Sequence, residues 1–281
     1  APRFLDRLLR RGPAAEQAPE ASPRGLAPPD RGLAHAIAAE VLRWLVDLDT
    51  LIDSATRQRL PDDAKARFVL RIALAQALRL ATPPHAAISP ELPLDDGGPR
   101  KLVHGVFGTL NRGGASLPDH PSLPAEVHAR IGGNWGERVA DATAAAIAAP
   151  PPLDLTLQAE VAELQGESLL PNHLRITGHT AVPDLPGYAE GAWWVQDLAA
   201  SLPARLIGGG TGRALDLCAA PGGKTLQLAA AGWDVTAVDI SQSRLARLSE
   251  NLARTGLAAN TVTADLLDWE PGFEADAVLL D

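Results

Sequence analysis

The hydrophobic positions of the first 118 residues recur at the three- and four-residue spacing of helices that face a core. They predict a long helix that Asp30 caps, a second helix over 63–80 and a third over 100–111. The second helix carries apolar side chains on more than one face, so we expect it to be central and buried. The stripe of the first helix consists of Leu33, Ile37, Val41, Leu45 and Leu48.

Three prolines at 150–152 mark a change in the pattern. The residues before them, 119–150, are again helical. After them, leucines that alternate with polar residues predict a strand over 153–157 and another over 174–177, with a short helix over 161–165 between them.

From Arg213 onward, short apolar runs alternate with amphipathic stretches, which predicts a parallel, doubly wound sheet. The expected strands are 214–218, 235–239, 261–263 and 277–280, and the expected helices are 224–231 and 243–255. We therefore divide the chain into three parts: an all-α domain over 1–118, a small α+β connector over 119–198, and the first half of an α/β Rossmann-like domain over 199–281.

Composition and charge narrow the possible partners. The single cysteine excludes an internal disulfide and disfavours a zinc site, and the seven histidines show no ligand spacing. No apolar run reaches the ~20 residues of a membrane span, and no secretory signal is recognisable, so we expect a cytoplasmic protein without membrane or metal. The net charge of −9 divides unevenly, with +3 over 1–118 and −12 over 119–281. If the protein binds nucleic acid, the N-terminal part is the better candidate for the contact.

The strongest chemical signal is the loop Asp216-Leu-Cys-Ala-Ala-Pro-Gly-Gly-Lys-Thr225, between a predicted strand and a predicted helix. Small residues allow a ligand to approach the backbone, and the helix N-terminus favours an anionic group. The glycine spacing fits neither a dinucleotide fingerprint nor a P-loop, which leaves an NAD-dependent dehydrogenase as a distant alternative. A ligand with a carboxylate and no phosphate, such as S-adenosylmethionine, suits the loop better.

Two further carboxylates follow the next strands. Asp239 ends the second strand about 20 residues after the loop, where an acidic residue accepts hydrogen bonds from ribose hydroxyls. Asp265 follows the third strand and is placed to meet an adenine. The alternative is that both are exposed loop residues that bind no ligand.

The loop resembles motif I of the RNA 5-methylcytosine methyltransferases of the Sun/Fmu/RsmB group. Residues 24–112, with Pro83-Pro-His-Ala-Ala87, resemble the NusB-like RNA-binding domain of the RsmB type. Residues 119–195, with Leu185-Pro-Gly187 and the adjoining Trp194-Val-Gln-Asp197, resemble its connecting segment. The resemblance implies a NusB-like all-α domain followed by a methyltransferase domain that uses S-adenosylmethionine.

The resemblance also implies roles for individual residues. Asp239 is expected to hold the ribose, Asp265 to lie by the adenine, and Asp281 to open motif IV, reach the cofactor site and orient the target cytosine. Seven loop residues are expected to line the cofactor: Cys218, Ala219, Ala220, Pro221, Gly222, Gly223 and Lys224.

In this group, a thiolate from a later motif adds to carbon 6 of cytosine and makes carbon 5 nucleophilic. We reject Cys218 as that thiolate because it lies in the cofactor loop, where we expect it to form a small wall of the pocket. The chain supplies four of the about seven strands expected of a methyltransferase sheet. We therefore expect the chain alone to bind cofactor at best, without turnover.

The resemblance implies naked small-subunit (16S) ribosomal RNA as the substrate of a monomeric enzyme. Two alternatives stay open. The substrate could be tRNA with the same chemistry, or the protein could be a non-catalytic RNA-binding protein with a NusB-like domain and a degenerate Rossmann half.

Overall fold

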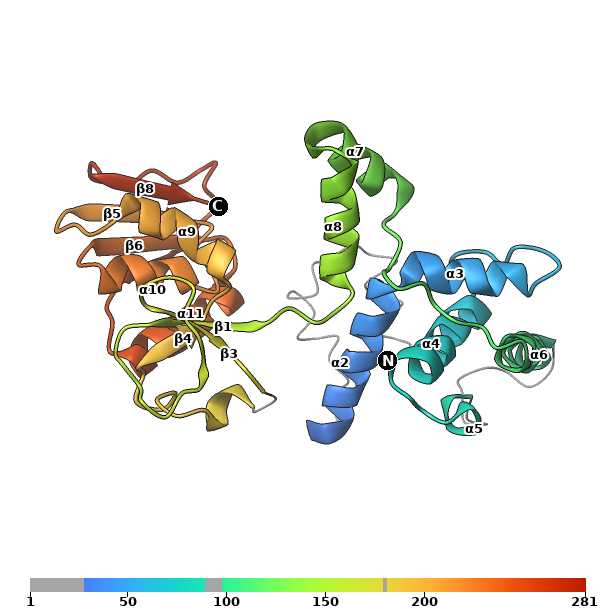
Figure 1. The fold of residues 1–281 in the computed structure, drawn as a ribbon. Helices are drawn as coiled ribbons and strands as arrows, with labels where there is room; N and C mark the ends of the chain where they lie inside the picture. The colour runs from blue at the N-terminus through green and yellow to red at the C-terminus, as the bar shows by residue number, and fades with distance from the viewer. Residues whose placement is uncertain (1–27, 89–97, 179–180) are drawn as a thin grey trace. The chain divides into compact units, whose positions relative to one another are not determined.

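A computed structural model of the chain describes residues 28–88, 98–178 and 181–281 (Figure 1). The chain folds as two compact units, Ala1–Pro150 and Pro151–Asp281. Of the expected helical domain over 1–118, residues 1–27 and 89–97 lie outside the described ones. The three-part division of the chain stays a prediction, with the second unit holding both the connector strands and the Rossmann-like sheet.

Among the described residues of the first unit, every regular element is a helix, as predicted. Its helices are α2 (Pro28–Arg43), α3 (Leu45–Ser54), α4 (Lys65–Arg79), α5 (Pro84–Ala87), α6 (Gly98–Arg112), α7 (Ala125–Trp135) and α8 (Glu137–Ile147). Helix α4 packs against α2, α3, α5 and α6, and all ten residues from Ala66 to Ala75 are buried. The prediction of a central, buried second helix is therefore confirmed.

The long first helix was predicted wrongly in two respects. Helix α2 already includes Pro28, so Asp30 lies within the helix and does not cap it. It also breaks at Trp44, whose φ of −105° and ψ of 21° separate α2 from α3. Backbone hydrogen bonds continue across the break, from Leu48 N to Trp44 O, so the apolar spacing on either side is kept and the pattern hides the break. Leu33 is 53% exposed and does not belong to the core.

The second unit begins with an antiparallel sheet in the order β2-β3-β1-β4. Its strands are β1 (Leu153–Leu157), β2 (Gly166–Glu167), β3 (His173–Ile176) and β4 (Trp193–Val195), and a 3₁₀ turn, η2, spans Val182–Asp184. Both indoles of β4, those of Trp193 and Trp194, are buried. The short helix predicted over 161–165 is wrong: these residues form a turn, in which Leu164 N donates to Val161 O at 3.2 Å.

The parallel sheet follows in the order β7-β6-β5-β8, so the predicted βαβαβ pattern is confirmed. Its strands are β5 (Arg213–Leu217), β6 (Asp234–Asp239), β7 (Asn260–Thr263) and β8 (Ala277–Leu280). The helices α9 (Leu198–Ile207), α10 (Gly223–Ala230) and α11 (Gln242–Thr255) pack against it. This order brings the carboxyl ends of β5 and β6 side by side, at the edge where ligands bind in open α/β sheets.

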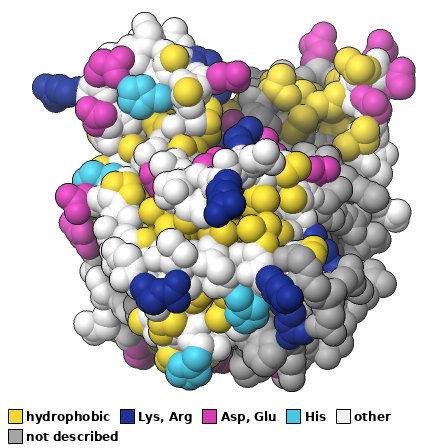
Figure 2. Space-filling view, turned by 90° about the vertical axis from the view of Figure 1, so that its right-hand side faces the viewer, with side chains coloured by type: hydrophobic (Ala, Val, Ile, Leu, Met, Phe, Trp, Pro, Cys, Tyr) yellow, Lys and Arg dark blue, Asp and Glu magenta, His cyan; other side chains and the backbone are white. Residues whose placement is uncertain are grey.

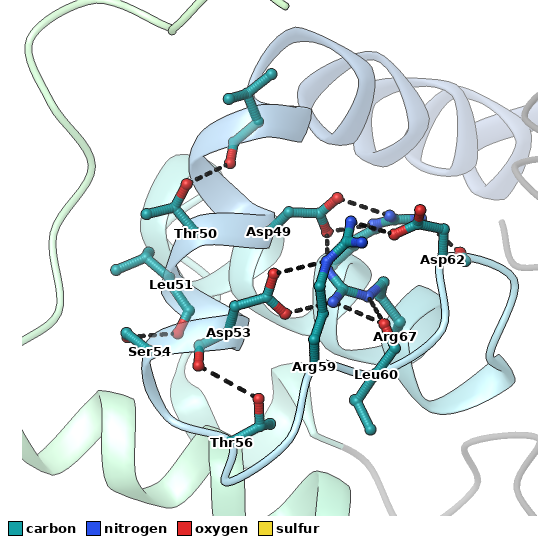
Figure 3. Close-up of polar contacts among 12 residues, drawn as sticks. Asp49, Thr50, Leu51, Asp53, Ser54, Thr56, Arg59, Leu60, Asp62 and Arg67 are labelled. Atoms are coloured by element: carbon teal, nitrogen blue, oxygen red, sulfur yellow. Dashed lines mark hydrogen bonds and ion pairs between the residues drawn. The ribbon is translucent and has the colours of Figure 1, made fainter.

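A group of charged side chains lies where α4 meets α3 in the first unit (Figure 3). Arg67 is fully buried, pairs with Asp53, lies 3.0 Å from an oxygen of Asp49, and donates from Nε to the carbonyl of Leu60 at 3.0 Å. Arg71 is also buried and forms two bonds of 2.8 Å with Asp49. Each buried guanidinium is therefore balanced by carboxylates of the preceding helix.

Replacing Arg67 by alanine should destabilise the first unit by about 3–5 kcal/mol, because the change leaves buried acceptors without their partner. The matched control is Arg59→Ala. Arg59 bonds the same Asp53 but its side chain is 65% exposed, so we expect a loss below about 1 kcal/mol. Urea denaturation followed by the helical circular dichroism signal measures both losses, and equal losses would contradict this account.

Candidate cofactor site

The predicted cofactor loop leaves the carboxyl end of β5 and crosses the end of β6. Leu217, the last residue of β5, is in register with Val238, and Ala219 N donates to Val238 O at 3.0 Å. Cys218 has a φ of +60° and is exposed, whereas Ala219 and Ala220 are buried. The loop therefore turns sharply at Cys218 and lays two small side chains on the core.

Glycine is required where the loop enters α10. Gly222, the N-cap, has a φ of +109°, which side chains rarely adopt, and a Cβ there would collide with Leu248 of α11. A Cβ on Gly223 would come within 3.3 Å of the Gln196 side chain. The predicted residues Pro221 to Lys224 thus present backbone at the start of a helix, whose first N–H groups lack partners within the helix.

Asp239 is buried and hydrogen-bonded to the loop, which the sequence did not indicate. Its side chain accepts hydrogen bonds from Ala220 N at 3.1 Å and from Ser241 N at 2.9 Å, and the residue is only 2% exposed. It therefore holds the loop to the end of β6. Its expected role toward a ribose stays a prediction, which would use the remaining lone pairs of the carboxylate.

Asp216 lies beneath the loop and is 1% exposed. Burial raises the pKa of its carboxyl to about 6, although the hydrogen bond that Thr225 Oγ1 donates to it at 2.5 Å and the nearby charge of Lys224 act in the opposite direction. Asp281 and Asp239 add to the rise in pKa by repulsion. Three carboxylates therefore gather near one edge of the sheet.

The two remaining predicted residues differ in their surroundings. Asp281 follows β8 and forms an ion pair with Lys224 of α10, so the structure brings these two predicted residues together. Asp265 is exposed, and its Oδ1 accepts a hydrogen bond from Leu267 N at 3.0 Å in the turn after β7. Its assignment to an adenine also stays a prediction.

Comparison with known proteins identifies the domain that carries this loop. Residues 209–281 match the family model of the 16S rRNA methyltransferase RsmB/F. Residues 6–92 match the NusB family, which confirms the resemblance of the N-terminal helical part to the NusB type.

Curated relatives match most of the chain. Ribosomal RNA small subunit methyltransferase B of Xylella fastidiosa (strain 9a5c) is 32% identical over 90% of this chain and 66% of its own length. The proteins of the same name from Pseudomonas syringae pv. tomato and Yersinia enterocolitica are 30% and 28% identical, over 64% and 73% of their lengths. The chain thus spans just under two thirds of the Xylella and Pseudomonas relatives.

A solved structure supports the fold. The crystal structure of PH0851 covers 94% of this chain and 69% of its own length, with a TM-score of 0.61 and 19% identity. At that identity the likeness shows the fold alone.

Sequence analysis missed one residue that holds the loop of the RsmB/F domain. Arg244, in the first turn of α11, donates from Nη2 to the carbonyl of Ala220, and the same nitrogen lies 3.9 Å from Asp239 Oδ2. An arginine in the first turn of the helix after β6 was the available signal, since that turn lies beside the loop.

Three features of these residues fit S-adenosylmethionine. Gly222 lies so close to α11 that no Cβ would fit, and the start of α10 offers backbone N–H groups to an anion. An acidic residue, Asp239, ends the neighbouring strand. A cavity of about 520 Å³ in the same unit has a different lining, including Gln158, Asn172 and Arg205, and none of the predicted cofactor residues borders it. Within residues 28–88, 98–178 and 181–281 no cluster of candidate metal ligands occurs. In the same described ranges, every helix is too short or too polar to span a membrane.

The buried Asp216 should make the stability of the RsmB/F domain depend on pH. Because its pKa is about 6 in the folded domain and 3.8 in the reference state, the folded domain binds more protons between these values. The stabilising contribution is therefore complete below about pH 4 and is lost as the pH rises through 6. The loss is of the order of 3 kcal/mol, which is the pKa difference converted to free energy.

Urea denaturation of the wild type and of Asp216→Asn, at several values between pH 4 and 7, measures this effect. Asparagine keeps an acceptor for Thr225 and cannot titrate, so the wild type should lose stability relative to the variant as the pH rises. A difference between the two proteins that stays constant over this range would refute the assignment.

Proposed function

We propose that this chain is the cofactor-binding and RNA-docking part of an S-adenosylmethionine-dependent methyltransferase that modifies carbon 5 of a cytosine in small-subunit ribosomal RNA. The observation that carries the proposal is the loop from β5 to α10, tied by Asp239 to the end of β6 and packed by Gly222 on Leu248. The names of the curated relatives support ribosomal RNA of the small subunit as the substrate.

S-adenosylmethionine, when bound, supplies the methyl group from a positively charged sulfonium. The start of α10 would receive its carboxylate, and Asp239 would accept hydrogen bonds from its ribose hydroxyls. Asp265 would lie by its adenine. Asp281, paired with Lys224 in the structure, would orient the cytosine.

The chain itself holds one thiol, on Cys218, and we assign that thiol to the wall of the cofactor site. Ala219 and Ala220 after it are buried, and the loop turns at the cysteine. A nucleophile must reach carbon 6 of a base while the methyl donor lies at carbon 5, so a residue of the donor's own loop is poorly placed for attack. We therefore infer that residues 1–281 alone bind cofactor without turnover.

The first unit is the proposed site of RNA docking. In the face that Figure 2 shows, Lys, Arg and His side chains lie around hydrophobic patches, and Asp and Glu side chains are present as well. Arg57, Lys101 and Arg112 are exposed, and Arg57 borders a hollow of about 610 Å³ that α6 also lines. Such side chains are suited to contact phosphates, while the hollow offers apolar surface to an unstacked base. We place the enzyme in the cytoplasm, as a monomer that requires no metal.

Cofactor binding should depend on Gly222. Gly222→Ala places a methyl group against Leu248 and holds a non-glycine residue at a φ of +109°, which costs on the order of 1–3 kcal/mol at this position. We expect the affinity for S-adenosylmethionine, measured by isothermal titration calorimetry, to fall about tenfold or more. Gly272→Ala is the control, because a Cβ there meets nothing within 4 Å, and it should bind as the wild type does.

Transfer of tritiated methyl groups tests the substrate. The complete product of the gene, with residues 1–281 in parallel, is incubated with naked small-subunit rRNA and with bulk tRNA. We expect label in the rRNA, recovered as 5-methylcytosine, and none from residues 1–281 alone. Label in tRNA would keep the chemistry and change the substrate. Cofactor binding without label in either RNA would favour the non-catalytic RNA-binding protein.

A further inference from the structure

Gln196 occupies an unusual position for an uncharged polar residue. It follows β4, is 6% exposed, and uses both ends of its side-chain amide. Its oxygen accepts from Thr156 Oγ1 at 2.8 Å and from Trp194 Nε1 at 2.9 Å. Because an indole nitrogen can only donate, these two bonds fix which end of the amide faces the antiparallel sheet.

The nitrogen end of the same amide faces the helices. Gln196 Nε2 donates to Gln227 Oε1 of α10 at 2.6 Å and to the carbonyl of Ala200 in α9 at 3.4 Å. Gln227 is held in turn, since its own amide nitrogen donates to Ser201 O at 3.1 Å. One buried side chain thus joins the connector sheet to two helices of the parallel sheet.

The same side chain lies directly against the start of α10. A Cβ on Gly223 would come within 3.3 Å of Gln196 Cδ and 3.4 Å of its Cγ and Nε2. Gln227, its bonded partner, lies one turn further along α10. Gln196 therefore contacts the first turn of the cofactor helix at one point and bonds the second turn at another.

We propose that Gln196 is a positioning residue that fixes the first turn of α10 against the connector sheet and thereby sets the backbone N–H groups of Gly222 and Gly223 for the cofactor. The link to the cofactor rests on the proposed function, whereas the position of the first turn of α10 does not. The connector thus supports the cofactor site through α10 without contacting the ligand. Removing the amide while keeping its volume should loosen that turn and weaken cofactor binding.

The test compares Gln196→Met with Gln158→Met in the chain of residues 1–281. Gln158 is the matched control because its Nε2 also joins the connector to the parallel-sheet part, donating to Gly191 O at 2.6 Å and to Thr255 O at 2.8 Å, at the far end of α11. Amide hydrogen exchange over 222–227 is measured without ligand, and the affinity for S-adenosylmethionine by calorimetry. A third variant, Gln196→Glu, retains the acceptor for Trp194 and Thr156 and replaces the amide donor at the other end by a second acceptor oxygen.

We expect Gln196→Met to speed exchange over 222–227 at least fivefold and to weaken cofactor binding by a similar factor, whereas Gln158→Met changes neither. Gln196→Glu should resemble Gln196→Met, because the donor to Ala200 O is lost. Unchanged exchange over 222–227 in Gln196→Met, or an equal change in Gln158→Met, would overturn the positioning role. Faster exchange with unchanged affinity would overturn its link to the cofactor. A wild type that binds no S-adenosylmethionine would refute the proposed function, while exchange would still decide the position of α10.

Discussion

The close approach of the loop after β5 to helix α11 is the constraint on which the candidate site depends. Gly222 lies against Leu248 with no room for a Cβ, and Asp239 accepts a hydrogen bond from Ala220 N across the ends of two parallel strands. Since β5 and β6 are adjacent in the sheet, both contacts follow from the strand order. Asp281 is joined to the same loop through its ion pair with Lys224.

In both units, several buried charged side chains pair with side chains of a neighbouring element. Arg67 and Arg71 of α4 meet carboxylates of α3, and Asp154 of β1 accepts two bonds from Arg175 of β3. The bonds from Arg175 hold the pKa of Asp154 below its usual value, although burial acts to raise it. Removing one partner of such a pair costs more than the pair contributes. The main effect of these contacts is therefore to fix how neighbouring elements pack. Their net contribution to the free energy of unfolding is smaller.

The sequence predicted elements with strong periodicity and missed features that depend on one side chain. Helix α4 was recognised because its apolar positions cover several faces, although Arg67 and Arg71 lie among them and are buried too. The break at Trp44 was missed because it does not disturb the apolar spacing. In the site, the loop and Asp239 were found from glycine pattern and spacing. The burial of Asp239 and the contact of Arg244 depend on packing between elements, which no local pattern records.

Charge separates the tasks that the proposed function assigns to the two parts of the chain. Asp216, Asp239 and Asp281 gather at the edge that would receive a cationic sulfonium, within the part of the chain that carries −12. That field attracts a positively charged cofactor and repels RNA phosphates. Phosphate contacts must then come from elsewhere, and residues 1–118, with +3, are the less acidic part. Long-range attraction to RNA would thus arise away from the cofactor loop, and its strength should decrease as salt increases.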